Sequence, residues 1–138
     1  MKRYWLLVTC LFGAFTILSP AIAGDRSTLQ ADIDAGAVLL TTADLRILLT
    51  NNTLKGAKFV AYYPEGKKRI IKYKGKRFTT KWWIDENYGS CVISVRTKKK
   101  MCGLVARIGD NKFRSYENKN CTPLASFSVL EGNPEGLK

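Results

Sequence analysis

Residues 57–108, AKFVAYYPEGKKRIIKYKGKRFTTKWWIDENYGSCVISVRTKKKMCGLVARI, decide the fold, because they form five short β-prone stretches separated by turn residues. The breaks fall at Pro64–Gly66, Gly75, residues 85–89 and residues 97–100. Proline fixes φ at the start of a turn, and glycine tolerates the positive φ that tight hairpins require. Short strands that recur about every ten residues predict an antiparallel meander curled into a small barrel or half-barrel.

Within these stretches side chains of two kinds alternate, as expected of a sheet with one buried face. The set predicted to face inward is Phe59, Ala61, Tyr63, Ile71, Tyr73, Phe78, Thr80, Trp82, Ile84, Cys91, Ile93, Val95, Cys102, Leu104, Ala106 and Ile108. The set predicted to face outward is Lys72, Lys74, Arg77, Thr79, Lys81, Trp83, Arg96 and Arg107. We therefore expect a mainly β protein, α+β by strict count, with apolar residues on one side of the sheet and cations on the other.

Flanking segments complete the predicted domain. Residues 113–117 and 125–130 are predicted to be the last two strands. Upstream, a short helix is expected at about residues 42–50, with Thr41 as its N-cap and Asp44 in the first turn, where a negative charge suits the helix dipole. Leucines at i, i+3 and i+4 form one apolar stripe. We expect this helix to cover one end or one open face of the sheet.

Residues 1–23 have the pattern of a secretory signal peptide, with a basic start, an apolar run and small residues up to Ala23 that favour cleavage before Gly24. A transmembrane anchor is a weaker interpretation, because the run is shorter than the roughly 20 apolar residues of a spanning helix. Lipidation at a cysteine within the run is weaker still. We predict an exported protein, periplasmic or extracellular, without a transmembrane anchor after cleavage. Residues 24–38 are expected to be a poorly ordered lead-in, which up to Asp34 could also be loosely helical, and residues 39–138 a single β-rich domain.

The chain is strongly basic, with 23 Lys and Arg against 11 Asp and Glu and a net charge of +12 at pH 7. Such a charge draws a protein toward polyanions, although charge alone does not identify the polyanion. In an exported protein the expected partners are an anionic polysaccharide, lipopolysaccharide or an anionic membrane surface, and no specific nucleic acid is expected. A basic but simply solvated surface is the plainer interpretation.

Three cysteines remain after the predicted cleavage: Cys91, Cys102 and Cys121. An oxidising compartment favours one disulfide and leaves one thiol over, and three pairings are possible. A hairpin centred on residues 98–99 would keep Cys91 and Cys102 too far apart, because the two Cα atoms must approach within about 7 Å. A hairpin centred on residues 96–97 would place them opposite each other, and we favour the Cys91–Cys102 disulfide in that register.

The absence of histidine excludes a histidine-dependent triad and a His-ligated metal site. The cysteines form no CxxC pair, so neither a structural zinc site nor a redox motif is expected. Acidic residues such as Asp85 and Glu86 fall in predicted turns; paired carboxylates could serve glycoside hydrolysis, but solvated turn acids are far commoner. We therefore predict no catalytic residue, no metal site and no cofactor, and expect that the protein is not an enzyme.

The outward cations are the best candidate for a binding site. The candidate residues are Lys72, Lys74, Arg77, Lys81, Trp83, Arg96 and Arg107. Cations interleaved with an exposed aromatic ring can hold a polyanion. Lysines on an exposed face also serve simply to prevent edge pairing between sheets. The function predicted from this face is non-enzymatic binding of an anionic envelope component.

Two alternatives remain open. The first is a protein-partner module, such as an inhibitor or accessory subunit of an envelope enzyme, that uses variable loops such as residues 85–89. The second is a small apolar ligand inside the barrel, next to inward aromatic residues such as Trp82, Phe78 and Tyr73. A filled core is the commoner use of such residues.

Several short motifs stand out along the chain: LLTNNTLKG at residues 48–56, the turn from Tyr63 to Gly66, Trp82 or Trp83 followed by two strand cysteines, and FSVLEGNP at residues 127–134. Together they resemble the small exported proteobacterial proteins grouped as a domain of unknown function. The resemblance extends over about Leu39 to Leu137. It implies a periplasmic or secreted β-rich domain, and it assigns no catalytic residues.

Overall fold

A computed structural model describes residues 28–138 of the 138-residue chain. The predicted signal peptide, residues 1–23, and its cleavage site lie outside the described residues. The elements in chain order are α2 (Thr28–Asp34), β1 (Val38–Leu39), α3 (Thr42–Leu49), β2 (Asn52–Gly56), β3 (Phe59–Tyr63), β4 (Lys68–Tyr73), β5 (Lys76–Asp85), β6 (Gly89–Ile93), β7 (Lys100–Gly109), β8 (Lys112–Glu117) and β9 (Pro123–Glu131). Neither helix of this part of the chain is long and apolar enough to span a bilayer.

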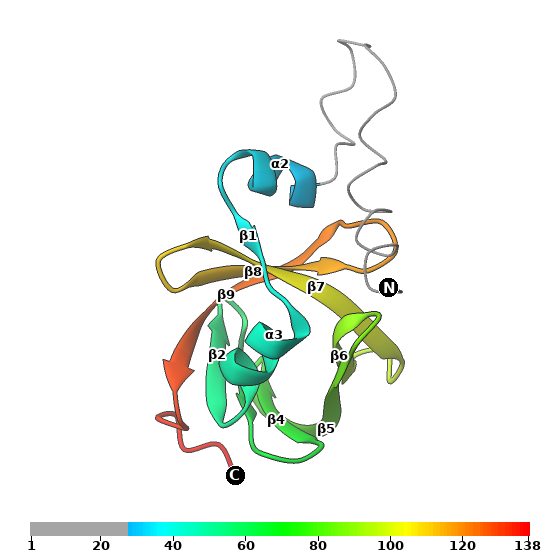
Figure 1. The fold of residues 1–138 in the computed structure, drawn as a ribbon. Helices are drawn as coiled ribbons and strands as arrows, with labels where there is room; N and C mark the ends of the chain where they lie inside the picture. Colours follow the sequence, from blue (N-terminus) through cyan, green and yellow to red (C-terminus); the bar gives the residue numbers. More distant parts are fainter. Residues whose placement is uncertain (1–27) are drawn as a thin grey trace.

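The strands form a closed barrel (Figure 1). Every neighbouring pair is antiparallel, in the order β1-β7-β6-β5-β4-β3-β2-β9-β8, and a further pairing of β7 with β8 joins the two ends. Strands β2 to β9 therefore make an eight-stranded ring, and the short β1 adds to the edge of β7. The predicted antiparallel barrel is confirmed, and β2, which the sequence did not reveal, is the strand that links the meander to β9.

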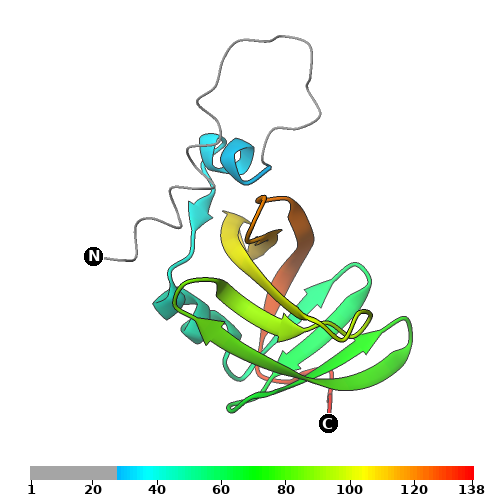
Figure 2. The same cartoon turned by 90° about the vertical axis from the view of Figure 1, so that its right-hand side faces the viewer.

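Helix α3 lies at one end of the barrel, and the β4–β5 and β6–β7 hairpins project from the other (Figure 2). The predicted N-cap is confirmed, because the Thr41 hydroxyl accepts a hydrogen bond from the Asp44 amide and the Asp44 carboxylate accepts one from the Thr41 amide. These hydrogen bonds to Thr41 hold the pKa of Asp44 below its usual value. The helix directs Leu45 and Leu49, both buried, toward the strands.

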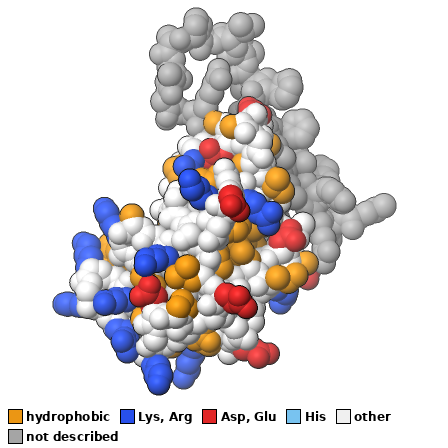
Figure 3. Space-filling view, turned by 90° about the vertical axis from the view of Figure 1, so that its left-hand side faces the viewer, with side chains coloured by type: hydrophobic (Ala, Val, Ile, Leu, Met, Phe, Trp, Pro, Cys, Tyr) orange, Lys and Arg blue, Asp and Glu red, His pale blue; other side chains and the backbone are white. Residues whose placement is uncertain are grey.

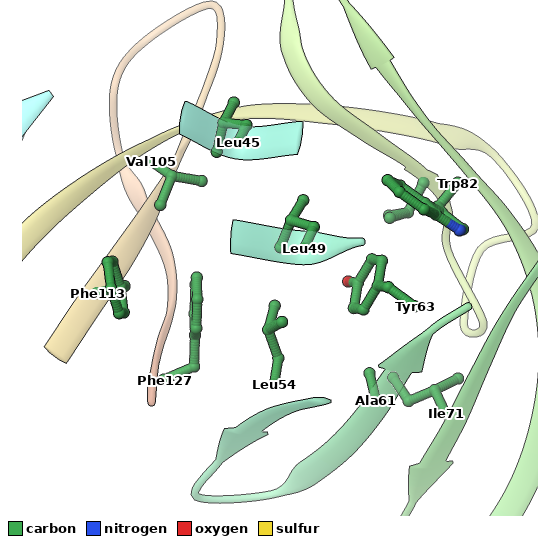
Figure 4. Packing of buried hydrophobic residues seen from close by; sticks show 11 residues of the cluster. Leu45, Leu49, Leu54, Ala61, Tyr63, Ile71, Trp82, Val105, Phe113 and Phe127 are labelled. Carbon is green, nitrogen blue, oxygen red and sulfur yellow. The ribbon is translucent and has the colours of Figure 1, made fainter. Parts of the chain in front are cut away.

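The main core lies inside the barrel around these two leucines. Figure 4 shows side chains from the helix and the strands converging on one another. The buried members are Leu45, Leu49, Leu54, Ala61, Tyr63, Ile71, Trp82, Val92, Val105, Phe113 and Phe127. The rings of Tyr63 and Trp82 meet edge to face at 5.2 Å between centroids, and Phe113 and Phe127 stack at 5.7 Å. Burial of Leu45 and Leu49 in this core holds α3 on the barrel. This packing is needed because a helix of eight residues is not stable by propensity alone.

A second, smaller core lies outside the barrel wall. Leu29 of α2 packs with Ala106 of β7 and Tyr116 of β8, and all three are fully buried. Asp32 of α2 forms an ion pair with Arg114 at 2.8 Å and accepts a hydrogen bond from the Tyr116 hydroxyl. Burial, and then the Asp32 carboxylate, raise the pKa of Tyr116, so the phenol stays protonated and donates.

The described part of the predicted lead-in, residues 28–38, is partly helical. It forms α2 and the start of β1, because the outer surface of β7 and β8 offers apolar side chains that α2 covers.

The predicted inward set is correct for β3, β4 and β5 and for Val95, which packs against the main core, but wrong for the residues of β6 and β7. Trp82 of β5 and Val92 of β6 pair with each other, and both face the interior. Because three loop residues separate Asp85 and Gly89 in the β5–β6 hairpin, the residues that face inward have even numbers on both strands. Cys91 therefore faces outward. On β7 the residues with odd numbers face inward, so Val105 lies in the interior. Its neighbours Leu104 and Ala106, which were predicted to face inward, face α2 instead.

The Cys91–Cys102 disulfide is confirmed, together with its register. Cys91 pairs directly with Cys102 in the β6–β7 hairpin, with Cα atoms 4.1 Å apart, and the hairpin is centred on residues 96–97. Directly opposed residues of a hairpin lie well within the Cα separation of about 7 Å that a disulfide can bridge. The expectation of one remaining thiol is not met, because Cys121 is buried and no cysteine of the described region is free.

Replacement of Leu49 tests the role of α3 as part of the core. Leu49→Ala removes a side chain that is 1% exposed, and the cavity it leaves should lower the free energy of unfolding by about 2–5 kcal/mol. Ile47→Ala, on the same helix but 78% exposed, is the matched control and should change it by less than about 0.5 kcal/mol. Urea denaturation measures both values. Equal effects of the two substitutions would show that α3 does not belong to the core.

Candidate functional site

Four cations stand in two rows on the outer surface of β4 and β5. Lys72 lies directly opposite Arg77, and Lys68 lies directly opposite Lys81. All four are exposed, while the alternate residues of β4 point inward. We call Lys68, Lys72, Arg77 and Lys81 the basic ridge. Figure 3 shows Lys and Arg side chains gathered along the lower edge of the molecule, the part where Figure 1 places β4 and β5.

The ridge places like charges where a sheet favours opposite ones. Directly opposed side chains have Cβ atoms about 5 Å apart, and like charges at that distance destabilise the pairing. Four residues of strand separate the two rows, which corresponds to about 13 Å. The ion pairs between described residues are Lys55–Glu135 and Arg114–Asp32, and neither involves the ridge. No acidic side chain of the described part of the chain pairs with the ridge, and Arg77 Nη1 donates a hydrogen bond to the main-chain oxygen of Lys138 at 3.2 Å.

Two predicted residues border the ridge without belonging to its rows. Lys74 lies in the β4–β5 turn with φ 48°, followed by Gly75 with φ 76°, and its Nζ atom lies 5.4 Å from the centre of the Tyr73 ring. Two residues of positive φ are typical of a two-residue hairpin turn. Trp83 is half-buried on the outer face of β5, opposite Cys91 of the disulfide. It is two residues from Lys81 on the same strand and therefore faces the same side of the sheet.

The last two predicted residues do not join this surface. Arg96 lies in the loop between β6 and β7, at the mouth of an interior cavity. Arg107 pairs with Phe113, an interior residue, and its guanidinium lies 5.9 Å from the centre of that ring. The expectation of one outer field from Lys72 to Arg107 is wrong for both residues. Arg107 has the parity of Val105, which faces the interior, and Arg96 lies in the β6–β7 loop, where it lines the cavity.

The barrel also contains a cavity of about 380 Å³. Leu49 of α3 lines it together with residues from most of the strands, and its lining is mainly apolar and aromatic. One charged residue within the barrel, Arg69, lines it although only 7% of Arg69 is exposed. Arg69 was not among the residues predicted from the sequence. Its position two residues before Ile71 and four before Tyr73, both predicted to face inward, was the signal that could have found it.

Arg69 is held by neutral partners on three strands. Its Nε atom donates to the Thr80 hydroxyl at 3.0 Å, Nη1 donates to the Tyr63 hydroxyl at 3.3 Å, and Nη2 donates to the Ile93 carbonyl at 3.4 Å. The guanidinium also lies 5.8 Å from the centre of the Tyr63 ring. A guanidinium has five N–H donors, so two remain for another acceptor. No carboxylate of residues 28–138 pairs with it.

Comparison with known proteins found no match to the chain among family models, curated proteins or solved structures. The resemblance to exported proteobacterial proteins therefore stays a prediction.

Reversal of one ridge charge tests whether the ridge is destabilised by its own repulsion. Lys81→Glu would place a carboxylate opposite Lys68, and the free energy of unfolding should rise by about 0.2–1 kcal/mol at low ionic strength. The gain should shrink in about 1 M salt because the charges are exposed and screened. Lys119→Glu, in the β8–β9 loop, makes the same change in net charge and is the control. A loss of stability in Lys81→Glu at low salt would contradict the repulsion.

Proposed function

We propose that this domain is a non-enzymatic binding module whose basic ridge holds an anionic polysaccharide of the cell envelope. The observation that carries the proposal is the pairing of like charges, Lys68 with Lys81 and Lys72 with Arg77. A sheet that only needed to stay soluble could alternate charges on this face at no cost in stability. The repulsion that the ridge tolerates becomes favourable when a polyanion lies across it.

The dimensions of the ridge suit a polymer better than a single small anion. Its two rows are about 13 Å apart along the strands, so one small ion cannot contact both. A chain with a negative charge on successive sugars can. Trp83, half-buried beside Lys81, offers a ring face against which a sugar can stack. Lipopolysaccharide and anionic membrane headgroups present repeated negative charges too, and an exported protein would meet all three.

Retention on immobilised heparin, a highly sulfated polysaccharide, tests the proposal. The wild-type protein should elute at a higher salt concentration than the double variant Lys68→Glu/Lys81→Glu, which reverses the charge of one whole row. Because the contacts are with exposed charges, retention should fall steeply as the salt concentration rises.

The control is a double variant with the same change in net charge, Lys112→Glu/Lys119→Glu. Lys112 belongs to β8, which lies across the ring from β4, and Lys119 lies in the loop that follows β8. If the ridge is the site, this control should elute close to the wild type. Equal losses of retention in both double variants would mean that net charge, not the ridge, determines binding, and would refute the proposal.

A protein partner is a second candidate function, favoured by large hydrophobic side chains that are exposed to solvent. Ile47 of α3 is 78% exposed, and Tyr88, in the predicted loop 85–89, is 42% exposed. A docked envelope protein would bury both. Cross-linking from a photoreactive residue at position 47 or 88 should then give one defined adduct in periplasmic extract, and the absence of any defined adduct would count against this function.

A further inference from the structure

The interior cavity is partly open to solvent. Leu49 of α3 lines it from one end of the barrel. At the other end the lining includes Met101 and Leu124, which are 39% and 41% exposed although they are large and apolar. Val95 and Arg96 of the β6–β7 loop lie beside them. An apolar rim around an opening allows a molecule with an apolar body to enter from solvent.

Arg69 places a positive charge inside this apolar space. Charged side chains are rarely buried unless an opposite charge or a full set of hydrogen bonds compensates them. Here the acceptors are two hydroxyls and one carbonyl, all neutral, and two N–H groups remain. A structural role for Arg69 explains its links to three strands. It does not explain why the residue is a cation, because neutral acceptors would be satisfied equally by a neutral donor.

We propose that the cavity binds one small amphipathic organic anion, with its carboxylate on Arg69 and its apolar body among the aromatic and aliphatic residues of the barrel. A planar carboxylate matches the fork of guanidinium donors and supplies the charge that Arg69 lacks. The volume of about 380 Å³ lies in the lower part of the range of small-molecule sites, roughly 300–1,000 Å³. The site is separate from the basic ridge, since Arg69 and the ridge residues project from opposite faces of β4.

The same features exclude other classes of ligand. A polymer or a multiply charged anion would need more cations than Arg69 within the barrel, and the rest of the lining is neutral apart from Arg96 at the mouth. A neutral apolar molecule would leave the guanidinium without its counter-charge. A cationic amphiphile would be repelled by Arg69. The charge of the headgroup should therefore decide affinity when the apolar body is held constant.

Three probes with the same ten-carbon chain test this on the unaltered protein: decanoate, 1-decanol and decyltrimethylammonium. Isothermal titration at a salt concentration of about 0.15 M should show one saturable site for decanoate. Decanoate should bind at least about tenfold more tightly than 1-decanol, because a charge-assisted bidentate contact is stronger than a neutral one. Decyltrimethylammonium should bind more weakly than 1-decanol.

Substitution of Arg69 then tests whether this residue recognises the negative charge of the headgroup. Arg69→Met keeps an unbranched side chain of similar length without the charge, and it should weaken decanoate binding about tenfold or more while leaving 1-decanol binding unchanged. A purely structural role would change both probes alike. Arg69→Lys keeps the charge and should retain part of the preference for decanoate. Val95→Trp, at the mouth, should weaken both probes, and the ridge variant Lys68→Glu/Lys81→Glu should change neither.

The series on the wild-type protein decides the matter even if Arg69→Met fails to fold. The proposal is overturned if decanoate shows no saturable binding, or if 1-decanol binds as tightly as decanoate. It is also overturned if folded Arg69→Met keeps the preference for decanoate. Loss of heparin retention in the ridge variant with unchanged decanoate binding would show that the two sites are independent, so that either proposal can fail alone.

Discussion

Closure of the strand ring is the constraint on which the rest of the structure depends. Hydrogen bonds of β2 with β9 and of β7 with β8 turn an open sheet into a barrel. Closure removes the edges that would otherwise recruit other strands, and it gives every strand an inside and an outside. The enclosed space must be filled or covered, and α3 does this with Leu45 and Leu49 at one end. What α3 leaves unfilled is the cavity that Arg69 lines.

Charge is distributed on both sides of the barrel wall in ways that packing alone does not require. Outside, four cations face one another in two rows on β4 and β5. Inside, Arg69 lies among neutral groups on the opposite face of the same strand β4. Neither arrangement is balanced by an acidic side chain of residues 28–138, and each would be stabilised by an anion. This shared imbalance is the physical reason for assigning two different binding surfaces to one small domain.

Much of the fold could be predicted because its signals are local. Turn residues such as Pro64 and Gly75 mark the hairpins, and the Thr41–Asp44 capping box marks the start of α3. The polar strand β2 gave no such signal, because it is stabilised by pairing with β9, about 75 residues away in the chain. Helix α2 was expected to be loose, since its partners Ala106 and Tyr116 are equally remote.

The residues of the candidate site could be predicted only on strands where the sequence shows which side chains face inward and which face outward. Between β3 and β5 the alternation is unambiguous, so Lys72, Arg77 and Lys81 were placed correctly. In β7 every residue from Met101 to Ala106 is apolar or glycine, so periodicity cannot tell inside from outside. The three-residue β5–β6 loop sets the parity of β6, and the pairing of Val92 with Met101 then sets that of β7. A shift of one residue in either hairpin reverses every side chain that follows. Arg69 was overlooked because a cation on an apolar face conflicts with the usual segregation, although this conflict is what makes it informative.

Nuclear magnetic resonance of the folded domain tests closure of the ring most directly. Closure predicts backbone NOEs across β2–β9, including Leu54 with Val129, together with NOEs across β7–β8, including Leu104 with Tyr116. The same spectra should show Val105, not Leu104, in contact with the leucines of α3. An absence of the β2–β9 NOEs in a sample that shows those of the β3–β4 and β4–β5 hairpins would mean an open sheet. Such a sheet has no enclosed interior, and that result would contradict both the closed barrel and the ligand cavity within it.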